Sequence, residues 1–131
     1  CGKMGEHTAN AGKVYFAAGT PDREDMRPDR TLDLAGSVTR ELGEETGLRV
    51  DEVAVGEGWT ALIEPGRVAF MREVRIDLSA EAARALMLDR MSELEEEELS
   101  DIVIVRDLAE TEKHDMPPFM RRYLAHMFDG K

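Results

Sequence analysis

Three glutamates with the spacing of one helix surface are the residues best suited to chemistry in this sequence. Glu41, Glu44 and Glu45 lie in residues 34–46, where apolar residues recur at helical spacing. At about 100° per residue, Glu45 falls inside the apolar arc and Glu41 about 20° outside its edge. Carboxylates three or four residues apart on a helix repel one another by about 0.2–0.5 kcal/mol per pair. A hard divalent cation such as Mg²⁺, which takes oxygen ligands, would turn this repulsion into shared attraction.

The simpler interpretation is a glutamate-rich surface helix, because many helix faces are merely solvated. The residues around the three acids favour a functional interpretation. Residues 40–48 read RELGEETGL, which resembles the second half of the Nudix box, R-E-U-x-E-E-x-G-U with U an aliphatic residue. From average residue usage, such a match arises by chance on the order of once in 10⁵ chains of this length.

The resemblance implies a Nudix hydrolase, an α/β/α sandwich with a mixed β-sheet that uses Mg²⁺ or Mn²⁺. Such an enzyme hydrolyses a nucleoside diphosphate linked to another moiety, by in-line attack of water on one phosphorus without a covalent enzyme intermediate. The resemblance assigns metal binding to Glu41, Glu44 and Glu45 and places Arg40 beside them. Positioning and electrostatics would then supply most of the rate acceleration.

The first half of the box departs from the family pattern. Met26 stands where the pattern has a Gly, and Leu32 stands where it has a Glu that supports the box arginine. An insertion of about seven residues in the loop over residues 20–30 would align Gly19 with the family's turn, since surface loops tolerate insertions. The backbone carbonyl of Ala18 or Gly19 would then be a metal ligand. The loss of the Glu at Leu32 concerns the orientation of Arg40 more than metal binding.

A carboxylate must also orient or deprotonate the attacking water. Family members often draw this base from a loop downstream of the box, and residues 93–98 contain five acids just before an apolar strand. Glu97 or Glu98 is the candidate. A solvated acidic turn is the simpler interpretation of such a run.

Three aromatic side chains, Tyr15, Phe16 and Trp59, have the chemistry to stack on a nucleobase. Aromatic residues in strands more often belong to the core. The eight methionines are most simply explained as core residues that fill irregular gaps. The sequence therefore predicts no specific base-reading residue.

The composition limits the partners. With 131 residues the chain is expected to form a single domain over residues 1–131, and its net charge of −11 disfavours long nucleic acid. Cys1 is the only cysteine, and no apolar run approaches the length of a membrane span. We expect a cytoplasmic protein with a small nucleotide-diphosphate substrate and no membrane partner; homodimers are common in the family. The chain begins without Met and with little sequence ahead of residue 13, so we expect that N-terminal strands of the fold are missing.

Local patterns predict the elements that must position these residues. Asp33 is a candidate N-cap for the helix that carries the glutamates, and Gly47 is a candidate left-handed residue after its end. Ser79 can cap a second helix, and Pro65 with Gly66 suggests a hairpin turn. The expected strands cover residues 13–18, 48–55, 60–64, 67–76 and 102–105, and the expected helices cover residues 34–46, 80–91 and 117–128.

Two other functions remain open at this point. The broken upstream half of the box is compatible with a Nudix-fold ligand-sensing or interaction module without turnover. A smaller alternative is an isomerase on the same fold, because fold alone does not set the reaction. Retention of all three glutamates favours the hydrolase.

Overall fold

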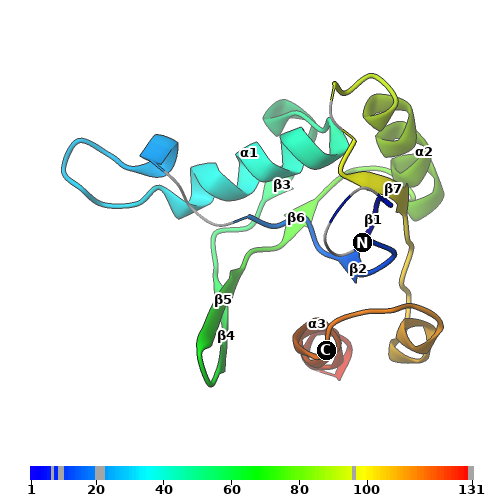
Figure 1. Cartoon of the computed structure of the whole chain (residues 1–131). Coiled ribbons are helices and arrows are strands. Elements are labelled where there is room, and N and C mark those ends of the chain that lie inside the picture. Colours follow the sequence, from blue (N-terminus) through cyan, green and yellow to red (C-terminus); the bar gives the residue numbers. More distant parts are fainter. Residues whose placement is uncertain (7, 9–10, 20–22, 96, 130–131) are drawn as a thin grey trace.

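The computed structural model describes residues 1–6, 8, 11–19, 23–95 and 97–129 of a chain that combines α-helices with β-strands (Figure 1). Three α-helices and seven short strands occur in these residues. The helices are α1 (Leu34–Thr46), α2 (Ala80–Met91) and α3 (Pro118–Asp129). The strands are β1 (Gly2–Met4), β2 (Val14–Tyr15), β3 (Ala54–Val55), β4 (Thr60–Glu64), β5 (Arg67–Met71), β6 (Val74–Arg75) and β7 (Leu99–Ile102). The described residues also form three short 3₁₀ helices, η1 (Arg23–Asp25), η2 (Val50–Glu52) and η3 (Leu108–Lys113).

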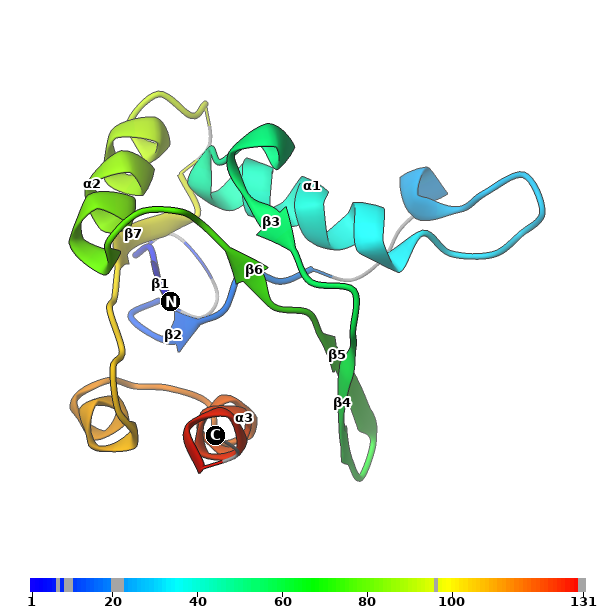
Figure 2. The ribbon, with the colours of Figure 1, turned by 180° about the vertical axis from the view of Figure 1, so that it is seen from behind.

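The strands form three small antiparallel sheets rather than the single mixed sheet expected from the resemblance. The largest has the order β2-β1-β7, and the other two are the pairs β3-β6 and β4-β5. Each strand pairing among the described residues is antiparallel. Strands of two to five residues leave most of the chain between the helices irregular. In both views the β4-β5 hairpin and α3 lie below α1 and apart from each other (Figures 1 and 2).

The three helices begin and end close to where the local chemistry predicts. The Asp33 side chain caps α1 by accepting a hydrogen bond from the backbone N–H of Gly36 (3.0 Å). Gly47 ends α1 in the left-handed region, with φ of 76°. Ser79 caps α2 by accepting from the N–H of Ala82 (3.1 Å). These caps satisfy backbone groups that a helix end leaves unpaired, so the boundaries can be predicted from few residues.

The strand boundaries were predicted less well, because they depend on distant partners. The expected strand at residues 13–18 is reduced to β2, and the one at residues 102–105 lies earlier, as β7. β1 was not predicted from the sequence. Its Gly2 pairs with Ile102 on one side and with Tyr15 on the other. This pairing with the first residues of the chain sets the register of β7.

The expected strand at residues 48–55 is mostly wrong. Residues Val50–Glu52 form η2, and only Ala54–Val55 is extended as β3. The Glu52 carboxylate accepts a hydrogen bond from the Arg49 backbone N–H (3.0 Å) and ion-pairs with Arg90 of α2 (2.8 Å). These contacts hold the segment in a tight turn that local β-propensity does not reveal.

The buried apolar residues form two clusters, one beside α3 and one beside α2. Val14, Met116, Met120 and Leu124 form the first, and Met91, Leu99 and Ile102 form the second. Three methionines therefore fill the core as expected, whereas Met26 is exposed. None of the helices in the described ranges combines the length and apolar character that a membrane crossing requires.

Replacement of Gly47 by alanine should destabilise the protein more than the same change at Gly66. Both glycines have a φ near 78°, a region that costs an L-residue about 1–2 kcal/mol. A Cβ at Gly47 would lie 2.5 Å from the Cβ of Arg90, whereas nothing lies within 4 Å of one at Gly66. We expect Gly47→Ala to cost at least about 1 kcal/mol more than Gly66→Ala in urea unfolding. Equal costs would mean that α1 and α2 are not packed this closely.

Candidate functional site

Glu45 is a buried carboxylate at the centre of the acidic residues of α1. Only 7% of it is exposed, and its Oε2 accepts a hydrogen bond from the backbone N–H of Ala18 (3.1 Å). Burial raises the pKa of Glu45 to about 8 despite that hydrogen bond, and the negative charges of Glu41, Glu98 and Glu44 act in the same direction. The helical projection placed Glu45 on the inner face, and the structure confirms its burial.

The turn that follows β2 lies directly against the same helix face. Gly19 is so close to Glu41 that a Cβ at this position would lie 2.4 Å from Oε1 of the carboxylate. Together with the bond from Ala18 to Glu45, this contact brings the two predicted backbone positions to two of the three predicted acids. Only glycine fits here unless Glu41 moves.

Glu44 is placed differently from the other two glutamates. Its side chain is 56% exposed, and its Oε1 lies 3.3 Å from Nη1 of Arg40. Arg40 Nη1 also lies 3.5 Å from Oε1 of Glu41. Arg40 therefore spans two of the acids from the side of the helix, in the position that the sequence suggested.

Asp25 is the residue of this site that the sequence analysis missed. Its Oδ2 lies 2.9 Å from Nη2 of Arg40, and its side chain is only 5% exposed. The backbone carbonyl of Asp25 accepts a hydrogen bond from the N–H of Asp33 (2.6 Å), which ties η1 to the start of α1. The only sequence indication was an acid in the preceding loop.

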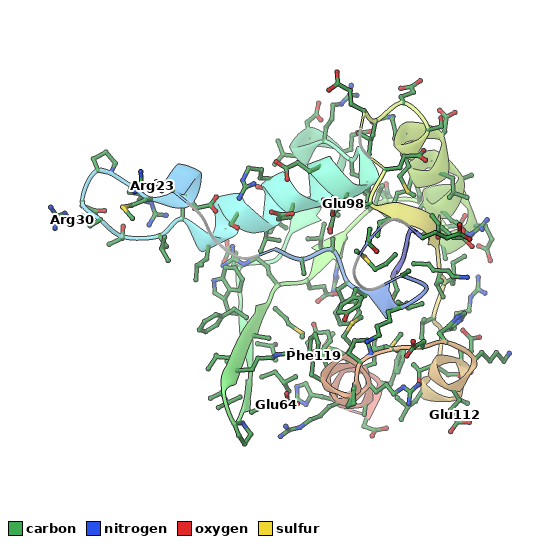
Figure 3. The ribbon with its side chains drawn as sticks, viewed as in Figure 1. Arg23, Arg30, Glu64, Glu98, Glu112 and Phe119 are labelled. Atoms are coloured by element: carbon green, nitrogen blue, oxygen red, sulfur yellow. The ribbon has the colours of Figure 1, made fainter. Side chains whose placement is uncertain are left out.

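Met26 and Leu32, which differ from the upstream half of the motif that the chain resembles, pair with each other. They form an isolated antiparallel bridge, and the Arg27 N–H donates to the Thr31 carbonyl (2.8 Å). The segment between them projects beyond the start of α1, where Figure 3 labels Arg30. Leu32 is 46% exposed. Residues 20–22 of the expected loop lie outside the described residues.

Of the two candidate bases, Glu98 is the one whose charge acts on Glu45. It immediately precedes β7, and its backbone carbonyl accepts from the N–H of Gly5 (2.8 Å). Figure 3 shows Glu98 beneath the C-terminal half of α1. Both Glu97 and Glu98 are exposed in this loop. Their positions in the sequence alone do not show which of the two acts on Glu45.

Among the described residues, no three His, Cys, Asp or Glu side chains converge closely enough to hold a metal ion. What the structure brings together is smaller: the carboxylates of Glu41 and Glu45 and the turn at Ala18 and Gly19, with Glu98 close enough to affect Glu45. This is a partly enclosed acidic site, whose polar groups are carboxylate oxygens and backbone groups.

Of the three aromatic residues named from the sequence, Tyr15 and Phe16 pack against the core cluster beside α3 as expected, whereas Trp59 is partly exposed. Tyr15, Phe16 and Trp59 line a cavity of about 870 Å³, which also contacts Ala18 and Gly19. Phe16 makes an edge-to-face contact with Tyr123 (5.4 Å between centroids). The acidic site and the cavity thus share one wall.

Comparison with known proteins leaves the site to be interpreted from its own geometry. No protein-family model matches the chain, and neither a curated protein nor a solved structure matches it.

The stability of the metal-free protein should fall as pH rises, because of Glu45. Its pKa is raised from 4.5 to about 8, so the folded state holds a proton that the unfolded state releases. This contribution is complete below pH 4.5 and is lost as pH rises through about 8. In EDTA we expect the free energy of unfolding to fall by more than about 1 kcal/mol across this range.

Urea unfolding at a series of pH values measures this dependence. Glu45→Gln should flatten it, whereas Glu112→Gln, an exposed residue of η3, should leave it unchanged. The same slope in Glu45→Gln and in the wild-type protein would show that Glu45 is not the titrating group.

Proposed function

We propose that the chain is a metal-dependent pyrophosphohydrolase of the Nudix type, with the α/β/α fold of that family. The observation that carries the proposal is the buried Glu45, which lies between the Ala18–Gly19 turn and the charges of Glu41 and Glu98. Burial of a carboxylate among other carboxylates is unfavourable unless a proton or a cation compensates. A cation would explain why the sequence places these acids on the inner face of α1.

Magnesium or manganese fits the donors that are present. Mg²⁺ prefers oxygen ligands and commonly keeps several waters, using only one or two carboxylates together with substrate phosphates. Glu41 and Glu45, with a backbone carbonyl of Ala18 or Gly19, are sufficient for such a site. Glu44, exposed on the same helix, would be a further ligand in this proposal. The lack of a converged three-ligand cluster among the described side chains is compatible with this sparse coordination.

Each residue of the site then has a defined task. A bound dication would neutralise charge on the diphosphate and lower the pKa of a water molecule. Glu41, Glu44 and Glu45 would hold the dication, and Arg40 contacts Glu41 and Glu44 from the side. Asp25 in turn fixes Arg40. Glu98 is the preferred residue to orient or deprotonate the attacking water, with Glu97 as its neighbour.

The reaction is hydrolysis of a nucleoside diphosphate linked to another moiety. Water attacks one phosphorus in line, the bridging Pα–O–Pβ bond breaks, and the departing phosphate carries the bridging oxygen. The chain contributes positioning and electrostatic stabilisation rather than a nucleophile. The small diphosphate also suits a chain of net charge −11, because a dication screens its phosphates.

Hydrolysis should require both the dication and the α1 glutamates. We expect a panel of nucleoside diphosphate derivatives to include one that is cleaved in Mg²⁺ but not in EDTA. Glu44→Gln and Glu45→Gln should each reduce kcat/KM by at least about 100-fold. Glu112→Gln is the matched control and should retain activity. Ligand binding without turnover across the whole panel would instead establish the sensing module.

Asp25 should matter more to activity than Leu32. Asp25→Asn removes the charge of a buried carboxylate that contacts Arg40, so we expect kcat to fall by at least about 30-fold with cooperative unfolding retained. Leu32→Glu should change activity by less than about tenfold, or roughly 1.4 kcal/mol, because Asp25 already holds Arg40. Steady-state kinetics and urea unfolding of both variants test this. A larger effect at Leu32 than at Asp25 would contradict the assignment.

A further inference from the structure

The cavity beside the acidic site has a wall of unusual composition. It measures about 870 Å³, and all but one of the chain's seven aromatic residues line it. In contrast, none of its described lining residues is Asp, Glu, Asn, Gln, Lys or His, although the chain contains 28 acidic residues. Leu34, Val38 and Leu42 of α1 and Met71 of β5 are among the lining residues. The volume lies in the range of sites that enclose a small organic molecule.

The cavity lies between the β4-β5 hairpin and α3, beneath α1. Both views show the hairpin and α3 separated here, and residues of both line the cavity (Figures 1 and 2). Arg67 of β5 reaches across to α3, with its guanidinium carbon 4.7 Å from the ring centroid of Phe119. Figure 3 labels Phe119 at the side of α3 nearest the hairpin.

The two charged residues of the lining are both arginines. Arg72 stacks its guanidinium 4.0 Å from the ring centroid of Trp59 and donates from Nη2 to the Glu57 backbone carbonyl (3.0 Å). Within the described part of the chain, neither Arg67 nor Arg72 has a carboxylate at ion-pair distance, and Nε of Arg72 is buried without a hydrogen-bond acceptor. Positive charge held against aromatic rings, in a strongly acidic chain, favours a ligand that is both apolar and negatively charged.

The lining also discriminates between classes of organic group. A sugar or the edge of a nucleobase carries several polar atoms, and each needs a hydrogen-bond partner when it leaves water. The amide and carboxylate side chains that usually supply such partners are absent from the described lining. The lining residues include four with hydroxyl groups, Tyr15, Ser37, Thr46 and Tyr123, and the Thr46 hydroxyl already donates to the Leu42 carbonyl (2.6 Å). A hydrocarbon or aromatic group requires no such partners and gains from burial.

We infer that the cavity binds the moiety linked to the diphosphate, and that this moiety is a large apolar group rather than a sugar. The inference rests on the proposed function for the diphosphate itself. The phosphates lie at the Ala18–Gly19 wall that the cavity shares with Glu41 and Glu45, and the apolar group extends between the hairpin and α3. The arginines attract the negative charge of the ligand.

Direct binding is tested with 1-anilinonaphthalene-8-sulfonate, an aromatic anion that fluoresces in apolar surroundings. We expect saturable binding in EDTA, independent of catalysis. Ala69→Trp fills the cavity from β5 and should weaken binding at least tenfold. Ala85→Trp on α2 is the control: Ala85 is exposed and lies outside the lining, so the change should alter binding less than twofold. Val38→Trp fills the cavity from α1 and repeats the test from another wall.

Because this dye also binds loosely packed proteins, each variant is checked for cooperative urea unfolding. Arg72→Gln should weaken binding several-fold, whereas Arg75→Gln, which removes an exposed arginine outside the lining, should not. Absence of dye binding, or equal binding in the wild-type protein and both filled variants, would overturn the inference.

A matched pair of substrates separates this inference from the proposed function. The dodecyl ester of ADP and ADP-ribose share the nucleoside diphosphate and differ only in the linked group. We expect kcat/KM for the dodecyl ester to be at least tenfold higher, and Ala69→Trp to abolish this difference. Equal or preferred cleavage of ADP-ribose would overturn the inference and retain the hydrolase. Cavity-specific dye binding with cleavage of neither ester would support the apolar site and overturn the hydrolase.

Discussion

The site depends on one contact, between the carboxylate of Glu45 and the backbone N–H of Ala18. This hydrogen bond joins the inner face of α1 to the turn after β2, and it forms where little of the carboxylate is exposed. A charged group in that position needs compensation, and a single N–H supplies only part of it. The negative charges of the surrounding acids make ionisation of Glu45 still less favourable. In the absence of a cation, a proton on Glu45 compensates its burial, which is why its pKa is raised to about 8.

The local chemistry of the sequence was sufficient to predict the helix that carries the acids. Asp33 and Gly47 mark its ends, and the helical phase of Leu34, Val38 and Leu42 places Glu45 inward. Each of these inferences uses neighbours within a few turns, for which backbone geometry is nearly fixed. The Pro65–Gly66 turn between β4 and β5 was predicted for the same reason. The resemblance to the Nudix box suggested roles for these glutamates, but it did not predict how they are arranged in space.

What could not be predicted depends on contacts between distant residues. β1 lies in a polar, glycine-rich segment, and its extended form comes from pairing with β7, about 100 residues later. Asp25 has no spacing that marks it as a partner of Arg40, because the loop between them is irregular. The inner face of α1 was expected to pack against a core, yet Val38 and Leu42 line a cavity. Helical periodicity identifies which side is apolar, but not whether protein atoms fill the space beyond it.

The bridge between Met26 and Leu32 separates the projecting segment from the residues that contact α1. Because it closes the projecting segment at its base, residues can be added or removed beyond it without moving Asp25 or the start of α1. The entropic cost of such a change grows only with the logarithm of loop length, by about 0.6 kcal/mol per doubling. The segment beyond the bridge can therefore be lengthened or shortened while Asp25 keeps its contact with Arg40.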